Sequence, residues 1–174
     1  MMLLELLNEV VDIDTDIFLS LNRMHSPFFD YFMSTYSGKW IWIPMYAAIW
    51  YVMLRNFHWK VTLFCMVGLA LVITNTFGLA FFVWFLFRKR WLTVFMMGWA
   101  LLTCYSRIYL GVHYPGDLIV GTLIGLLAAY IVYRLFLKVS GYKTMKKVPH
   151  IYAPILVGGL TIVGILVYST VMIL

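Results

Sequence analysis

Long stretches without a charged side chain are the feature that most limits how this chain can fold. One of the two longest extends from Val61 to Phe87 without a single Lys, Arg, Asp or Glu. A helix needs roughly 20 apolar residues to cross a bilayer. Of the 174 residues, 64% are hydrophobic and 11% are charged, which leaves too little polar surface for a soluble globule. The sequence therefore predicts an integral membrane protein.

The apolar runs are the expected membrane-spanning segments, and the third and fourth each have one arginine near the end, Arg107 and Arg134. The runs cover Trp40–Leu54, Val61–Phe87, Trp91 to about Tyr109, Leu118–Leu137 and Val148–Leu174. Backbone groups in lipid must be paired within the segment, which favours helices. We expect a single all-α domain over residues 1–174, built as a polytopic membrane helical bundle.

The first 30 residues have a different pattern. Glu5, Glu9, Asp12 and Asp16 recur at helical spacing, and leucines occupy another face. This pattern predicts an amphipathic helix that lies in the membrane interface and does not cross it. The Ser26-Pro27 pair should break that helix. The basic start of a secretory signal is not present.

Positive charge gathers in the connections between the apolar runs. The net charge of +6 comes from clusters around Arg55 and Lys60, around Arg88–Arg90, and from Arg134 to Lys147. Such clusters favour the cytoplasmic side, so the amino terminus and the loop around His113 are expected on the outer side. We interpret the charge as a topology signal and expect no nucleic-acid partner.

The basic clusters conflict with the length of the second run. If residues 61–87 crossed once, Lys60 and Arg88 would lie on opposite sides. Two crossings remove the conflict, but they need about 40 residues. We therefore predict that a segment is missing near residues 73–77, so that two short antiparallel helices replace one. Six transmembrane helices are then expected.

Three polar side chains should meet at one membrane boundary. Asp117 is the only carboxylate after Asp30, His113 lies four residues before it, and Arg107 lies at the end of the third run. Ionisable groups at such positions mark functional sites by default. Arginine clamps phosphoryl oxygens, histidine is a nucleophile at neutral pH, and a carboxylate can orient the imidazole. The combination suits phosphoryl transfer, with the His113 ring within hydrogen-bond reach of Asp117.

The pattern Ser106-Arg107-(five residues)-His113-(three residues)-Asp117 resembles the third signature motif of the type 2 phosphatidic acid phosphatase superfamily. The resemblance implies a six-span membrane fold and hydrolysis through a phosphohistidine on His113. It implies that Asp117 orients His113, and that Arg107 and Ser106 bind the substrate phosphate. The family's first motif, K-(six residues)-R-P, and its second, P-S-G-H, do not occur in the chain. Both belong where the segment is expected to be missing.

The expected function is hydrolysis of a phosphate or diphosphate monoester on a membrane lipid, at the outer face of the inner membrane. Undecaprenyl diphosphate, phosphatidylglycerol phosphate, phosphatidic acid and lipid A phosphate are candidate substrates. No metal or organic cofactor is expected. The alternatives are a non-catalytic lipid-headgroup-binding protein or pseudoenzyme of the same fold, and a small transporter or channel subunit.

Each site residue also has a plainer interpretation. Asp117 could cap the fourth span, Arg107 could be a topology arginine, and His113 could be an interfacial histidine. Trp42 and its neighbours are expected to be belt or packing aromatics, and Lys39 a snorkelling lysine. The shared spacing of the three residues favours the catalytic interpretation.

Overall fold

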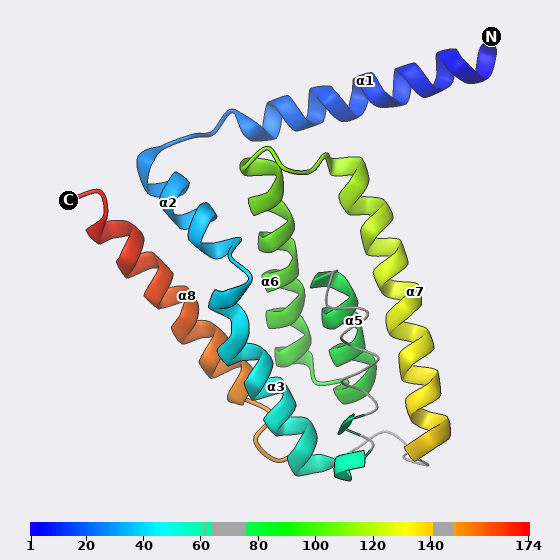
Figure 1. Ribbon diagram of the computed structural model, residues 1–174, viewed down its shortest axis with the longest axis vertical. Coiled ribbons are helices and arrows are strands. Elements are labelled where there is room, and N and C mark those ends of the chain that lie inside the picture. The colour runs from blue at the N-terminus through cyan, green and yellow to red at the C-terminus, as the bar shows by residue number, and fades with distance from the viewer. Residues whose placement is uncertain (61, 64–75, 141–147) are drawn as a thin grey trace.

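The computed structural model describes residues 1–60, 62–63, 76–140 and 148–174, and the regular elements in these ranges are all helices (Figure 1). In chain order they are α1 (Met2–Asn22), α2 (Pro27–Tyr36), the short 3-10 helix η1 (Trp40–Trp42), α3 (Ile43–Asn56), α5 (Thr76–Phe87), α6 (Arg90–Tyr109), α7 (Pro115–Ser140) and α8 (Ala153–Val171). The all-α prediction is confirmed for the described residues.

Helix α1 lies across one end of the bundle, over the ends of α6 and α7 (Figure 1). None of its residues is buried. It ends at Asn22, and α2 begins at Pro27, where Ser26 Oγ accepts a hydrogen bond from the Phe29 amide at 3.4 Å. The predicted break at Ser26-Pro27 is therefore confirmed. A crosswise helix at a bundle end suits the membrane interface, and the interfacial location of α1 stays a prediction.

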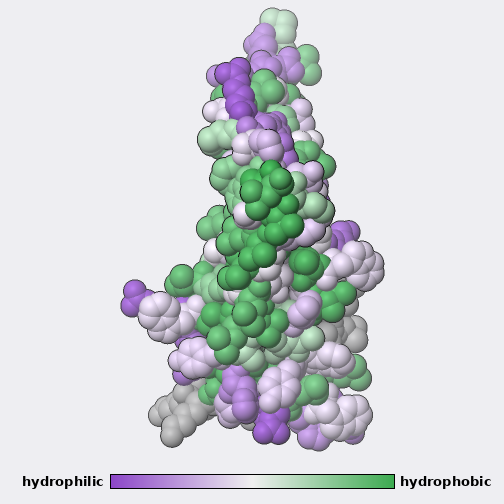
Figure 2. Space-filling view, turned by 90° about the vertical axis from the view of Figure 1, so that its left-hand side faces the viewer, coloured by the Kyte–Doolittle hydropathy of each residue, from purple (hydrophilic) through white to green (hydrophobic). Residues whose placement is uncertain are grey.

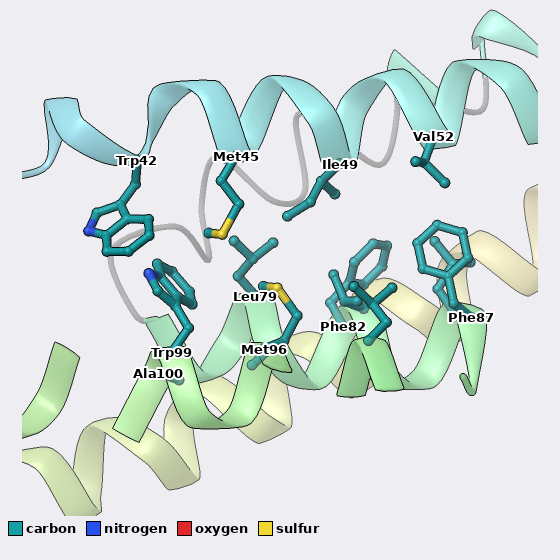
Figure 3. Close-up of a cluster of buried hydrophobic side chains, with 14 of the residues drawn as sticks. Trp42, Met45, Ile49, Val52, Leu79, Phe82, Phe87, Met96, Trp99 and Ala100 are labelled. Carbon is teal, nitrogen blue, oxygen red and sulfur yellow. The ribbon is translucent and has the colours of Figure 1, made fainter. Parts of the chain in front are cut away.

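The core lies between α3, α5 and α6 (Figure 3). Helix α3 contributes apolar side chains at spacings of three and four, which place them on one face. Leu79 and Phe82 of α5 and Met96 of α6 pack against that face. The α3 residues are Trp42 at its start and then Met45, Ile49 and Val52, all at most 4% exposed.

Helices α7 and α8 turn much of their apolar surface outward. Both are long and apolar enough to cross a membrane, and α5 is apolar but has only 12 residues. Leu123 of α7 is 62% exposed and Leu160 of α8 is 71% exposed. Figure 2 shows that apolar side chains cover the middle of the face it views, with hydrophilic ones toward the two ends. This surface fits a lipid environment. The expected number of six spans stays a prediction.

The basic connections meet at the end of the bundle opposite to α1. The Phe57 ring, just after α3, lies 6.4 Å from the Phe87 ring and 5.1 Å from the Phe136 ring. Asn56 Nδ2 donates to the Pro149 carbonyl at 3.2 Å. The ends of α3, α5 and α7 and the start of α8 are thus neighbours, as Figure 1 also shows. Within the described residues, the three basic connections share one end of the bundle, and the side of the membrane that this end faces stays a prediction.

The prediction of two short antiparallel helices in place of one concerns residues 61–87, with the seam near residues 73–77. Residues 61 and 64–75 lie outside the described part of the chain. The missing segment itself is therefore still a prediction.

Cysteine labelling can check the arrangement of the ends. In a background without Cys65 and Cys104, Lys60→Cys and Lys138→Cys should react with a membrane-impermeant reagent from one side. Thr15→Cys should react from the other, because α1 lies at the opposite end of the bundle. Labelling of Lys60→Cys and Lys138→Cys from opposite faces would contradict the topology.

Candidate active site

The loop that carries His113 is defined at both ends by backbone chemistry. Helix α6 ends in a Schellman motif: Val112 N–H donates to the Arg107 carbonyl and Gly111 N–H to the Ile108 carbonyl, both at 3.0 Å. Gly111 has φ +71, a conformation that glycine adopts at little cost. Proline at the first position then opens α7. His113 therefore sits in a short turn between two fixed helix ends.

His113 and Asp117 face each other without forming a hydrogen bond. His113 Nδ1 lies 3.9 Å from Asp117 Oδ2, and the two side chains are 50% and 65% exposed. The expected contact of roughly 2.6–3.2 Å is therefore wrong for this structure. Asp117 Oδ2 instead accepts from the Tyr114 amide at 3.4 Å.

The contact to Tyr114 corrects the plainer interpretation of Asp117. Helix α7 begins at Pro115, so Asp117 is its third residue and not its cap. A third-position carboxylate that reaches back to the capping residue's N–H satisfies a free donor and complements the helix dipole. The same carboxylate can serve the helix start and face His113, because the two partners are only one residue apart.

Arg107 and Ser106 are neighbours in sequence but point to different surroundings. Arg107 is half-buried in the last turn of α6 and lines a cavity together with His113 and Asp117. Ser106 is fully buried, and its hydroxyl donates to the Thr103 carbonyl of its own helix at 2.7 Å. Ser106 is not among the residues that line the cavity. The structure thus brings together three of the four predicted site residues.

The cavity has a volume of about 540 Å³, within the range of small-molecule sites. Its other walls come from the segment before η1, from α3, from the start of α5, and from α6 and α7. They are Ser37, Gly38, Lys39, Trp42, Tyr46, Thr76, Trp99, Thr103, Cys104, Leu118 and Gly121. The sequence analysis did not assign Lys39 and Trp42 to the site. It interpreted Lys39 as a snorkelling lysine and Trp42 as a belt or packing aromatic. Trp42 is indeed packed, at 2% exposure.

Helix α1 holds the His113 loop from outside. Asp14 Oδ1 accepts from the Gly116 amide at 2.8 Å, and the Phe18 ring lies 4.8 Å from the Tyr114 ring. Asn22 Nδ2 donates to the Ile108 carbonyl at 2.8 Å. These contacts join α1 to the residues on both sides of His113. The predicted acidic face gave no sign of this role, since Asp14 is not part of it.

A second polar cluster joins the start of α2 to the end of α6. Asp30 Oδ1 accepts from the Tyr109 hydroxyl at 2.6 Å and lies 2.9 Å from His25 Nδ1. The Tyr109 hydrogen bond, and then the His25 hydrogen bond, hold the pKa of Asp30 below its ordinary value of 3.8. Asp30 therefore stays ionised at neutral pH and anchors α2 to the helix that carries Arg107.

No group of three or more His, Cys, Asp or Glu side chains that could hold a metal ion occurs in residues 1–60, 62–63, 76–140 and 148–174. Among the described residues, the positive charge at the cavity comes from the side chains of Arg107 and Lys39, with His113 as a further group that can carry a proton. This set can neutralise an anionic ligand at the α1 end of the bundle.

The sequence matches known proteins over most of its length. The PAP2 superfamily profile matches residues 31–140. A lipid A 4'-phosphatase of Bacteroides thetaiotaomicron is 37% identical over 217 residues, which cover 92% of this chain and 96% of that protein. A lipid A 4'-phosphatase of Porphyromonas gingivalis is 24% identical over 176 residues, or 74% of this chain and 75% of that protein. No solved structure matches.

The anchoring role of Asp30 predicts a pH-dependent stability. A lowered pKa means that the carboxylate stabilises the folded state fully above the ordinary value of 3.8, and that this contribution is lost as pH falls toward the lowered pKa. Asp30→Asn should therefore lower the unfolding temperature in detergent at pH 7. The deficit relative to wild type should shrink as the pH falls below 3.8. An equal deficit at pH 7 and pH 3 would contradict the assignment.

Proposed function

The chain belongs to the PAP2 superfamily and is a membrane lipid phosphatase on that ground, and we propose that His113 is its nucleophile. The observation that carries the proposal is the meeting of Arg107, His113 and Asp117 at one cavity. Their spacing resembles the family's third motif, and their types suit phosphoryl transfer. The cavity lies at the bundle end away from the basic connections, which supports an active site on the outer face of the inner membrane.

The geometry suggests which ring nitrogen reacts. Nδ1 of His113 is the atom that faces Asp117, so Nε2 is the nitrogen left for attack. In the proposed step, the Nε2 lone pair forms a bond to phosphorus, and the bond from phosphorus to the lipid oxygen breaks. Arg107 binds the phosphoryl oxygens and stabilises their charge. Water then attacks the phosphohistidine and releases phosphate. Closure of the 3.9 Å gap to Asp117 would stabilise the charged ring as it forms.

The substrate is proposed to be a phosphorylated membrane lipid, and lipid A is the leading candidate. Two relatives are lipid A 4'-phosphatases, and the match to the first covers nearly all of both chains. The cavity, which is lined by Arg107 and Lys39, is compatible with an anionic lipid headgroup. The proposed mechanism uses only side chains and needs no metal ion or organic cofactor.

The leaving lipid oxygen needs a proton, and the chain lacks the P-S-G-H histidine that the family uses.

The lengths of the two alignments support a missing segment. The Bacteroides alignment runs over 217 positions, but 92% of 174 residues is only about 160, so about 57 of its positions have no counterpart here. The Porphyromonas alignment leaves about 47 such positions by the same comparison. We propose that they hold the first two motifs and belong near residues 73–77.

The absent motifs favour one competing function. A chain with only the third motif could bind phosphorylated lipid headgroups and turn them over poorly. Lipid binding without phosphate release, both in this chain and with the segment restored, would support that alternative.

Restoring the segment tests its role directly. A chimera that carries the intervening residues of the Bacteroides relative, inserted near residues 73–77, should release phosphate from lipid A faster than this chain. A general acid contributes about 10²- to 10⁴-fold, so kcat should rise by at least roughly 100-fold. Insertion of a Gly/Ser segment of the same length is the control. Equal rates for the chain and the chimera would contradict the proposal.

Substitution of His113 tests the nucleophile. In the chimera, His113→Ala should reduce kcat by at least roughly 10³-fold, and Asp117→Asn by on the order of 10²-fold. His58→Ala removes an exposed histidine at the opposite end of the bundle and should leave the rate near that of the parent. Trapping of a phosphorylated protein during turnover, and its loss in His113→Ala, gives an independent readout. Parent-like turnover by His113→Ala would eliminate it as the nucleophile.

A further inference from the structure

Three further residues with polar side-chain atoms line the cavity and lie outside the signature motif. Ser37 and Lys39 follow α2, and Trp99 comes from the middle of α6. All three line the same cavity as Arg107 and His113. None of them has a role in the mechanism proposed above, so their presence calls for a separate explanation.

Two of these side chains have buried polar atoms without a partner. Among the described residues, neither Ser37 Oγ nor Trp99 Nε1 makes a hydrogen bond. Trp99 is only 3% exposed. The neighbouring indole differs, because Trp42 Nε1 donates to the Tyr36 carbonyl at 2.8 Å. Buried polar groups are nearly always paired, so an unpaired one at a cavity wall points to a ligand.

The Trp99 indole is held in place by its surroundings. Its ring packs edge-to-face against Trp42, with ring centroids 5.5 Å apart, and against Tyr46 at 6.1 Å. Its carbonyl accepts from the Tyr36 hydroxyl at 3.3 Å. Figure 3 shows Trp42 and Trp99 side by side at one end of the core. A small rotation to find another partner is therefore restricted, so the N–H stays unpaired in this structure.

The chemistry of this group specifies the ligand. The indole N–H and the lysine ammonium only donate hydrogen bonds, and a serine hydroxyl can donate as well. Asp117 is the only carboxylate on the cavity wall among the described residues. A set of donors with a positive charge suits a group that only accepts hydrogen bonds, such as a phosphate or a carboxylate.

We propose that Lys39, Ser37 and Trp99 form a second anion subsite, which binds another acidic group of the same lipid headgroup. The inference rests on the proposed function: Arg107 and His113 take the phosphate that is removed, and the second subsite takes an anionic group that stays on the lipid. The preferred substrate is then a headgroup with two anionic groups. Lys39 determines that preference and takes no part in the chemistry.

Binding measurements can test the subsite apart from catalysis. The protein in detergent carries His113→Ala, so that no turnover occurs, and is titrated with a glycolipid that bears two phosphates and with its monophosphorylated form. Lys39→Gln should reduce the affinity ratio of the two lipids by roughly 10-fold or more, as expected for a hydrogen bond to a charged group. Lys138→Gln removes a lysine at the opposite end of the bundle and should leave the ratio unchanged.

Ser37→Ala separates binding from folding. Because Ser37 Oγ has no partner in the described part of the protein, its removal should not lower the unfolding temperature. It should still lower the affinity ratio. A ratio unaffected by both Lys39→Gln and Ser37→Ala would overturn the subsite. So would Lys39-dependent binding of inorganic phosphate that does not extend to the lipid, because the subsite would then hold a free anion.

Phosphate release by the chimera with His113 intact is measured in parallel, with and without Lys39→Gln. A Lys39-dependent ratio without any turnover would support the subsite and count against the proposed phosphatase mechanism. Turnover of both lipids, together with an affinity ratio that does not depend on Lys39, would support the phosphatase mechanism and count against the subsite. The two proposals can therefore fail separately.

Discussion

Exclusion of charge from the hydrocarbon layer is the constraint on which the rest of this structure depends. The outward surfaces of α7 and α8 are apolar, and a charged side chain in contact with the hydrocarbon layer is costly. Bases gather where α3, α5 and α7 end, and acids gather on α1. A polar site in such a molecule belongs at a helix end, and the cavity with Arg107 and His113 meets that expectation.

The turn between α6 and α7 holds His113 in a fixed position at one end of the bundle. A Schellman motif at Gly111 ends one helix, and Pro115 begins the next, so little freedom remains for the residues between them. Asp14 of α1 accepts from the Gly116 amide and fastens the turn from outside. Positional restraint of this kind is what phosphoryl transfer requires, because its catalysis consists mainly of positioning and charge stabilisation.

Much of the site was predictable, since its key residues are close in sequence. Arg107, His113 and Asp117 lie within about three helical turns, so local spacing already brings them to one boundary. The exceptions have physical reasons. Ser106 turns away because a buried serine in a helix can donate to a carbonyl of the preceding turn. Lys39 and Trp99 were missed because their meeting depends on how α2, η1 and α6 pack, which no local pattern encodes.

By itself, the sequence indicated a membrane protein with an all-α fold. It also showed the clustering of positive charge in the connections and identified the three motif residues. These follow from composition and from spacing along one chain, where hydrophobicity and local geometry act alone. Only the tertiary structure decided that α1 holds the His113 turn, that Lys39 and Trp99 line the same cavity as Arg107, and that Ser37 and Trp99 carry unpaired polar atoms. Those are contacts between distant segments, and they are set by side-chain packing in three dimensions.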